Sequence, residues 1–308
     1  MMTTNYLDAL DKLLLIGTSQ LSQEFIQRQG EFVIGKQSRD GGFTGRLGGA
    51  DLYYTDFGLR LARLLSPDLA TLETTGRWLA KRQADAQNLL DCFSLLNAAR
   101  LLRDMDIELP VAQPPLVSLL RAQQLAGSGF CRPGSRGISA YNTFIAALCC
   151  QMLEMDFPNS AGAVAAILGL KQSDGGCCES LGESLSQTNA TSAALAFLTM
   201  QDALDPAESD SAADFLSQMQ ATDGGLLAQP SAPEADLLST FTGALTLFGL
   251  NALDRIDLPA VAQFVGKLVH PRGGFRACPS DDEPDIEYTY YGMGTMALLR
   301  VYVLARQG

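Results

Sequence analysis

The chain has 308 residues, of which 47% are hydrophobic and 18% are charged, and its formal net charge at pH 7 is −12. Nucleic acids and anionic membranes are bound through basic surfaces, so this acidic balance argues against both as main partners. The sequence lacks an apolar run of ~18 residues, and we therefore expect no segment that spans a bilayer.

The N-terminus and the cysteines both indicate a cytoplasmic protein. Residues 1–19 predict an amphipathic helix rather than a signal peptide, because Asp8, Asp11 and Lys12 interrupt the apolar stretch. The seven cysteines include two directly adjacent pairs and have no C-x-x-C spacing. This pattern is typical of reduced, packed thiols rather than of a disulfide framework.

A glycine-rich punctuation recurs along the chain. Gln-x-x-Asp-Gly-Gly begins at Gln37 and Gln220, and a form that is one residue shorter, Gln-x-Asp-Gly-Gly, begins at Gln172. Shorter versions occur at 127–130 and 270–275. From residue 129 onward the turns are about 47 to 49 residues apart, a spacing typical of helical repeats. The first gap is about twice as long, which predicts a degenerate unit near 82–85 and six units in all.

Each unit has the same internal order. An amphipathic stretch, such as 74–84 or 209–220, ends at the glycines, whose freedom at positive φ stops a helix. A second stretch is apolar nearly all round, at 143–153, 191–200, 240–250 and 289–304. Such helices are buried on every side, so we expect amphipathic helices outside and apolar helices inside, in one domain over residues 1–308. An open helical solenoid that only binds protein is the alternative.

The turn followed by an apolar helix resembles the repeat of protein prenyltransferase β subunits and of terpenoid cyclases. Residues 129–135 (Gly-Phe-Cys-Arg-Pro-Gly-Ser) and 51–55 (Asp-Leu-Tyr-Tyr-Thr) are similar to the type II geranylgeranyltransferase β subunit in particular. Over residues 25–304 the resemblance implies an all-α fold: an α/α toroid of six helix hairpins around an isoprenoid pocket. It also implies a helical partner chain like the α subunit. It does not fix the reaction, because the superfamily includes transferases and cyclases.

The resemblance allows the prenyltransferase zinc site to be compared residue by residue. In that family an Asp, a Cys two residues later and a His in the next repeat bind a catalytic zinc. Asp236 matches the Asp, but Leu238 and Tyr288 stand at the Cys and His positions. We therefore expect no zinc site of the usual kind, and a rebuilt site with Asp236 and Cys278 is the alternative. The only histidine, His270, is expected to pack or cap in its turn.

The diphosphate and cyclase motifs of the superfamily are also altered. In the family, a short run before the zinc Asp carries the arginine and lysine that bind phosphate. The matching residues here, 228–233, include no arginine or lysine. Ser139 stands near the position of a pocket histidine, and Arg132 remains as a candidate anion contact. The Asp-x-Asp-Asp acid of cyclases is missing, and only its first residue is matched, by Asp51. Residues 281–285 fit Asp-Asp-x-x-Asp and would suit magnesium, although a solvated acidic loop at a helix start is the plainer interpretation.

The candidate site residues lie at the starts of the apolar helices. Asp51, Asp236 and Asp285 align there, and each either caps a helix or acts as an acid or base. Glu287 is a fourth candidate acid or base. The candidate substrate-binding residues are Tyr53, Tyr54, Phe57, Tyr141, Phe144, Phe241, Tyr288, Tyr290, Tyr291 and Arg132. Desolvated rings stabilise a carbocation by about 1–2 kcal/mol each, and simple filling of the interior is the alternative.

These observations predict a protein that binds an isoprenoid or another apolar small molecule. The expected reaction is prenyl transfer or cyclisation without the usual zinc, and a non-catalytic toroid scaffold is the alternative. Gly243 and Gly292 lie inside apolar helices, where glycine costs about 1 kcal/mol relative to alanine. They either allow helices to approach closely or leave room for a ligand.

Overall fold

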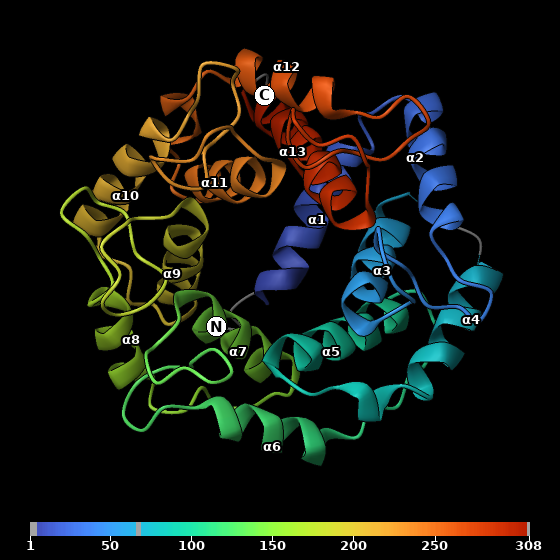
Figure 1. Ribbon diagram of the computed structural model, residues 1–308, viewed down its shortest axis with the longest axis horizontal. Helices are drawn as coiled ribbons and strands as arrows, with labels where there is room; N and C mark the ends of the chain where they lie inside the picture. The colour runs from blue at the N-terminus through green and yellow to red at the C-terminus, as the bar shows by residue number, and fades with distance from the viewer. Residues whose placement is uncertain (1–4, 66–68, 307–308) are drawn as a thin grey trace. The chain divides into compact units, whose positions relative to one another are not determined.

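The computed structural model describes residues 5–65 and 69–306, and in these ranges it contains thirteen α-helices, two 3₁₀ helices and no strand (Figure 1). The α-helices are α1 (Tyr6–Thr18), α2 (Gln23–Gly35), α3 (Leu52–Leu65), α4 (Leu69–Ala80), α5 (Leu89–Arg103), α6 (Gln113–Gln123), α7 (Ala140–Met152), α8 (Ser160–Leu168), α9 (Thr188–Met200), α10 (Pro206–Gln218), α11 (Leu237–Gly249), α12 (Leu258–Leu268) and α13 (Ile286–Ala305). The 3₁₀ helices are η1 (Gln83–Asp85) and η2 (Leu253–Arg255). The expected all-α class is confirmed.

The chain divides into two compact units. The first combines residues up to 121 with those from 268 onward, and there α13 packs along α1 and also contacts α3, which packs against α5 (Figure 1). The second unit is continuous, from 122 to 267, and in it α9 packs between α7 and α11. The single-domain expectation for residues 1–308 stays a prediction.

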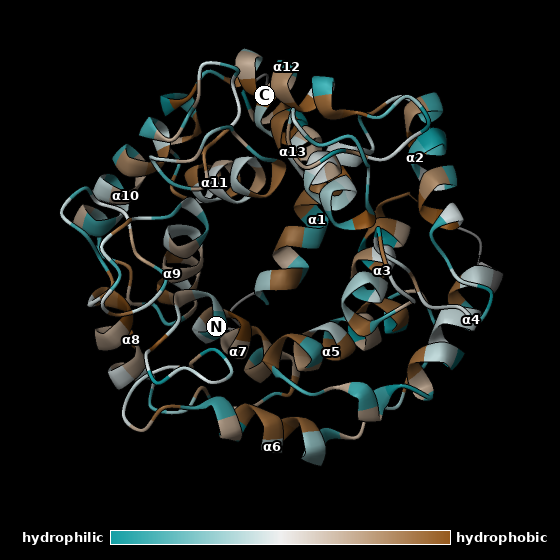
Figure 2. Cartoon of the chain, in the orientation of Figure 1, coloured by the Kyte–Doolittle hydropathy of each residue, from teal (hydrophilic) through white to brown (hydrophobic). Residues whose placement is uncertain are grey.

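Along the chain, helices with most of their residues buried alternate with helices that bury only one face. Most residues of α5, α7 and α9 are buried, whereas α2 buries only Gln29 and Val33. Figure 2 shows both hydrophobic and hydrophilic bands on α2, as expected for a helix with one face in solvent. The predicted apolar stretches are confirmed as α7, α9, α11 and α13, and the amphipathic ones correspond to α4 and α10. The helix η1 lies where the degenerate unit was expected.

The glycine turns share one backbone geometry. In each of five turns, residues six apart form an antiparallel bridge, for example Gln220 with Leu226. In the four turns with a Gly-Gly pair, the first glycine has a positive φ, which side chains with a Cβ rarely adopt. These glycines are Gly41 (φ 111°), Gly175 (91°), Gly224 (99°) and Gly273 (90°). The punctuation in the sequence therefore marks a required backbone conformation.

A buried threonine links each of these turns to the next buried helix. The amide after the glycine donates to the hydroxyl of a threonine that is the fourth residue of that helix. The five bonds are Phe43 to Thr55 (3.0 Å), Phe130 to Thr143 (3.0 Å), Cys177 to Thr191 (2.8 Å), Leu226 to Thr240 (2.9 Å) and Phe275 to Thr289 (3.1 Å). Cys92 holds the matching position in α5. The hydroxyl of Thr240 also donates to the carbonyl of Asp236 at 2.6 Å, so it joins the turn to the helix cap.

The glycines inside the buried helices make room for this turn. At Gly292 a Cβ atom would lie 2.3 Å from the Phe275 ring, which is too close for any side chain. In the same way, Gly58 lies against Phe43 and Gly243 lies against Leu226, the residues that correspond to Phe275 in their own repeats. Their nearest neighbours are therefore side chains of the preceding turn, which answers the question that the sequence left open.

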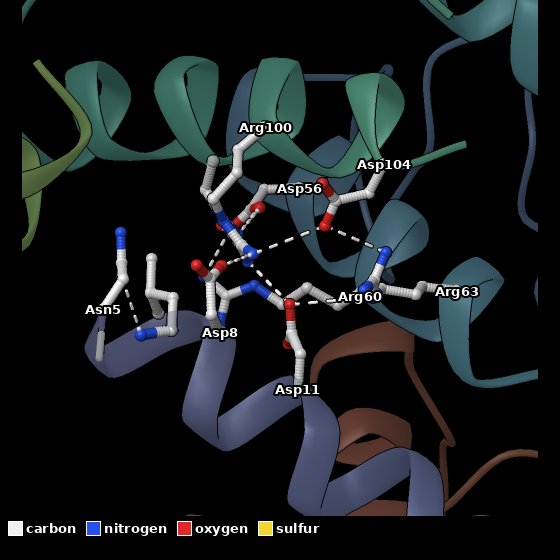
Figure 3. A network of polar contacts seen from close by, with 10 residues as sticks. Asn5, Asp8, Asp11, Asp56, Arg60, Arg63, Arg100 and Asp104 are labelled. Carbon is white, nitrogen blue, oxygen red and sulfur yellow. Dashed lines mark hydrogen bonds and ion pairs between the residues drawn. The ribbon is translucent and has the colours of Figure 1, made fainter. Parts of the chain in front are cut away.

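A buried ionic network joins α1 to α5 and α3 (Figure 3). Arg100 is only 6% exposed, and its guanidinium donates to Asp8 at 2.9 Å, to Asp11 at 2.8 Å and to Asn97 at 2.8 Å. Asn97 in turn donates to Asp56 of α3 at 2.6 Å. The charges that made the N-terminal segment look amphipathic thus pair with charges inside the unit rather than with solvent alone.

Asp56 extends this network towards aromatic rings. Its carboxylate accepts from Arg60 at 2.5 Å, and the guanidinium carbon of Arg60 lies 4.9 Å from the Phe57 ring centroid and 5.3 Å from that of Tyr290. Burial raises the pKa of Asp56 against the lowering effect of Arg60. A buried charge with this many partners is costly to disrupt, because the remaining partners would lose compensation.

We expect Thr240→Val to lower the free energy of unfolding by about 1–3 kcal/mol, because the buried Leu226 amide loses its acceptor while the side-chain volume hardly changes. Chemical denaturation followed by circular dichroism measures the change. Thr199→Val is the control, since the exposed Thr199 hydroxyl donates only to Leu195 of its own helix. Equal effects of the two substitutions would contradict a special role for the turn.

Arg100→Leu should lower the free energy of unfolding by about 3–5 kcal/mol, because it removes three ion pairs and leaves buried Asp11 with only its longer contact to Arg63, at 3.7 Å. Arg255→Leu is the control: it removes two ion pairs, to Asp210 and Asp214, but at the surface, so a loss below about 1 kcal/mol is expected. A small loss for Arg100→Leu would show that the network contributes little to stability.

Candidate functional site

The starts of α3 and α13 bring six of the candidate aromatic residues together. This aromatic cluster consists of Tyr53, Tyr54, Phe57, Tyr288, Tyr290 and Tyr291. The Phe57 centroid lies 5.0 Å from that of Tyr53 and 5.6 Å from that of Tyr291, which links the two helices. The rings meet edge to face, the arrangement that aromatic pairs prefer. Tyr53, Tyr54, Tyr288 and Tyr291 keep part of their surface accessible.

Glu287 lies within the aromatic cluster as an acceptor for two phenols. The Tyr53 hydroxyl donates to its Oε1 at 2.7 Å, and the Tyr291 hydroxyl lies 3.4 Å from the same oxygen. The residue is in the first turn of α13, where a negative charge interacts favourably with the helix dipole. The structure therefore places one candidate acid–base group in contact with two candidate substrate-binding residues, Tyr53 and Tyr291.

Arg46 binds the acidic loop that precedes α13. Its Nη1 and Nη2 donate to the two carboxylate oxygens of Asp281 at 2.9 and 2.5 Å, and its Nε donates to Asp285 at 2.8 Å. The guanidinium carbon lies 5.6 Å from the Tyr288 ring centroid. Two carboxylates of the Asp-Asp-x-x-Asp run are thus bound to an arginine. Asp285 caps α13, as expected for an acid at a helix start, but it is 3% exposed, so this part of the run is not solvated. Magnesium binding stays a prediction.

The aromatic cluster lies in a negative environment. Burial raises the pKa of Tyr54, and the charges of Asp285, Glu287 and Asp51 raise it further, whereas Arg46 lowers it. Burial also raises the pKa of Glu287, although the hydrogen bond from Tyr53 acts in the opposite direction. A carboxyl group with a raised pKa exchanges protons closer to neutral pH than an ordinary glutamate, as acid–base catalysis requires.

The three candidate aspartates all cap helices. Each accepts a hydrogen bond at Oδ1 from a backbone amide in the first turn: Tyr54 to Asp51 at 2.7 Å, Ser239 to Asp236 at 2.8 Å and Tyr288 to Asp285 at 2.8 Å. Burial raises the pKa of all three carboxyl groups. The capping alternative accounts for their positions, and an acid or base role for them stays a prediction. Glu287 differs from them, because its hydrogen bonds come from phenols.

Four candidate residues belong to the second unit. Phe241 is 4% exposed, and Phe144 packs against a core cluster that includes Ala147 and Phe197. Tyr141 is 39% exposed at the start of α7. Arg132 forms an ion pair of 3.2 Å with Glu179. Their roles in substrate binding stay predictions.

Glu179 is a buried acid that the sequence analysis did not single out. It is 3% exposed, accepts a hydrogen bond from the Ser139 hydroxyl, and lies 3.4 Å from the Tyr141 amide. Burial raises the pKa of its carboxyl group. Ser139 also caps α7 through the Asn142 amide at 3.0 Å, so this cluster has a structural explanation. The signal available in the sequence was an acid directly after two cysteines in a glycine turn.

The described residues contain no group of three or more His, Cys, Asp or Glu side chains that could hold a metal ion. Leu238 offers no donor atom, so the positions that match the usual zinc ligands do not fit that metal. His270 accepts from the Arg272 amide at 3.3 Å, and its own amide donates to Gly274 at 2.9 Å, so it packs in its turn as expected. No helix within the described ranges has the length and apolar character needed to cross a membrane.

A model of the prenyltransferase α/α toroid domain matches residues 6–90, 82–235 and 191–306. The chain belongs to this family. Among solved structures, Candida albicans protein geranylgeranyltransferase-I complexed with GGPP is similar to this toroid domain over 89% of this chain and 90% of its own, with a TM-score of 0.69 and 15% identity. A search of curated proteins finds no significant match.

Two further structures show how varied the proteins with this architecture are. A variant of the type II terpene cyclase MstE from Scytonema, in complex with its substrate geranylgeranyl dihydroxybenzoate, has a TM-score of 0.60 and 14% identity over 95% of this toroid chain and 98% of its own. A glycosidase has a TM-score of 0.59 and 12% identity over 98% and 100%. Identities this low show the fold alone, so the reaction of this toroid protein has to be argued from its site.

We expect Glu287→Gln to raise the melting temperature by about 2 °C at pH 8. Burial raises the pKa of Glu287 in the folded protein, so folding favours the protonated form. The stabilisation is complete below the pKa of the unfolded chain and is lost as the pH rises through the folded pKa. The neutral amide mimics the protonated group and can still accept from Tyr53, so the gain should disappear near pH 4.

The control for this measurement is Glu283→Gln, which removes a charge from an exposed side chain of the neighbouring loop. Its melting temperature should follow that of the parent protein at both pH values. A lower melting temperature for Glu287→Gln at pH 8 would mean that the hydrogen bonds from Tyr53 and Tyr291 stabilise the charged carboxylate by more than burial destabilises it.

Proposed function

We propose that this chain binds an isoprenoid, as a prenyl diphosphate or a terpenoid, at the aromatic cluster and catalyses prenyl transfer or cyclisation without zinc. Glu287 is the acid–base group in this proposal. The observation that carries it is that the half-buried carboxylate of Glu287 accepts hydrogen bonds from the phenols of Tyr53 and Tyr291 within the aromatic cluster. Membership of the toroid family supports it, as do the geranylgeranyl compounds bound by two similar structures.

In the proposed chemistry, the aromatic rings stabilise positive charge and the carboxylate of Glu287 accepts a proton. Prenyl transfer and terpenoid cyclisation both develop positive charge on carbon, and aromatic faces stabilise such charge by about 1–2 kcal/mol per desolvated ring. When a carbocation loses a proton, the C–H electron pair becomes the new double bond and the proton passes to a base, here Glu287. Tyr53 and Tyr291 orient this carboxylate and keep it an acceptor.

A non-catalytic scaffold or binding protein is the second candidate. It is favoured by the use of Asp51, Asp236 and Asp285 as helix caps, because capping alone explains why these acids stand where they do. A helical partner of the α-subunit kind fits either candidate, and so does a cytoplasmic location. Both remain parts of the proposal.

The proposal is tested by incubating the purified chain with farnesyl and geranylgeranyl diphosphate and with the corresponding alcohols, with and without magnesium. Isothermal titration calorimetry measures binding, and mass spectrometry detects products. We expect Glu287→Gln to bind the same compounds but to lose turnover by about 10²–10⁴-fold, the range for a general acid or base. Glu283→Gln should behave like the parent protein.

Three results are informative. Binding with turnover that depends on Glu287 supports the enzyme. Binding without turnover, unchanged by Glu287→Gln, favours the scaffold. If none of the isoprenoid compounds binds to folded protein, the proposed function is wrong.

A further inference from the structure

We propose that the ligand of the aromatic cluster is an organic cation, an amine or quaternary ammonium compound with an apolar tail, whose charged group binds at Glu287. This inference rests on the proposed function only in taking the aromatic cluster as the ligand site. It goes further by assigning the charge of the ligand, which neither the toroid fold nor the similar structures determine.

The balance of charge around the aromatic cluster is the first argument. On the side of the loop before α13, the carboxylates of Asp281 and Asp285 share Arg46, and Glu287 adds a further negative charge. On the other side, Arg60 is paired with Asp56, so this pair adds no net charge. The charges of Asp285, Glu287 and Asp51 also raise the pKa of Tyr54. A site of this sign repels a diphosphate and attracts a cation. Charge complementarity of this kind selects among ligands that share the same apolar part.

The two arginines in contact with the aromatic cluster are already paired: Arg60 with Asp56, and Arg46 with the loop before α13. Arg46 uses Nε, Nη1 and Nη2 on the carboxylates of Asp281 and Asp285. A bidentate pair of this kind is among the strongest polar contacts of a protein. A second arginine, Arg276, donates to the Asp281 carbonyl at 3.4 Å. An anionic group would have to displace Asp281 or Asp285 from Arg46, whereas a cationic one leaves these pairs intact.

The rings themselves already bind cations of the chain. The guanidinium of Arg46 lies 5.6 Å from the centroid of Tyr288, and that of Arg60 lies 4.9 Å from Phe57 and 5.3 Å from Tyr290. Three of the six rings therefore take part in cation–π contacts. Aromatic rings grouped around a carboxylate are the environment in which ammonium groups are recognised.

Glu287 supplies the countercharge in a defined orientation. Both phenol contacts fall on Oε1, from Tyr53 at 2.7 Å and from Tyr291 at 3.4 Å. The ammonium group is therefore expected at Oε2, with the apolar tail along the rings of Tyr53 and Tyr291. The apolar tail can still be isoprenoid, so of the two ligand classes in the proposed function the inference selects a terpenoid over a prenyl diphosphate.

The test compares three ligands with one tail, farnesylamine, farnesol and farnesyl diphosphate, at pH 8 and below their aggregation concentrations. Equilibrium dialysis against the full chain measures each dissociation constant. We expect farnesylamine to bind at least tenfold more tightly than farnesol, and farnesyl diphosphate to bind more weakly than both. Glu287→Gln should abolish the advantage of the amine and leave the affinity for farnesol within about twofold, because only the charge is removed.

Glu283→Gln is the matched control, since it removes the same charge from an exposed side chain of the adjoining loop and should preserve the advantage of the amine. Tighter binding of the diphosphate, or an amine advantage that persists in Glu287→Gln, overturns the inference. Equal binding of farnesol and farnesylamine overturns it too but leaves the proposed function standing. If none of the three ligands binds, the proposed function fails, and the inference fails with it.

Discussion

The hydrogen bond between a turn amide and a buried threonine hydroxyl links five glycine turns to the first turns of α3, α7, α9, α11 and α13. The same hydroxyl also donates to the capping residue, as Thr240 does to Asp236, so turn, cap and first helical turn form one unit. Because α3 and α13 obey the same rule, the residues beside Thr55 and Thr289 occupy equivalent positions on two helices that are in contact. Phe57 of α3 therefore lies 5.6 Å, centroid to centroid, from both Tyr290 and Tyr291 of α13. The aromatic cluster is therefore a product of the repeat rather than an addition to it.

The two sides of the cluster have different electrostatic partners. Towards α5, Arg60 and Asp56 form an ion pair, and Asn97 connects Asp56 to Arg100 (Figure 3). The charged groups on this side therefore stabilise the packing of α1, α3 and α5. Towards the loop before α13, carboxylates outnumber the guanidinium that they share. Charge that is balanced on one side and unbalanced on the other is typical of a site in which stability has been exchanged for binding.

Much of the helical architecture could be predicted because its signals are local. The turn glycines and the apolar stretches lie within a few residues of the elements that they specify. The buried helices were nevertheless expected to start at the threonine, three residues late in α7, α9, α11 and α13, because polar capping residues such as Ser139 and Asp236 conceal the first turn. The aromatic candidates could be found because six of them share helix starts.

The ionic contacts could not be predicted, because they join residues far apart in the sequence. Arg100 pairs with Asp8 across 92 positions, and Arg46 pairs with Asp285 across 239. Nothing local distinguishes these arginines from those at the surface, such as Arg255. Glu179 was missed for the same reason, since its burial depends on Ser139 and Arg132 from the preceding repeat.

The discontinuous first unit has a consequence for synthesis on the ribosome. Its N-terminal part, which includes α1, α3 and α5, emerges early, but α13, against which α1 and α3 pack, is translated only after the whole second unit. The second unit is one continuous segment and can complete its core while α13 is still unmade. The nascent chain therefore carries the apolar flanks of α1 and α3 uncovered until α13 is made, and we expect chaperone contact during that interval to fall on the N-terminal part of the first unit rather than on the second unit.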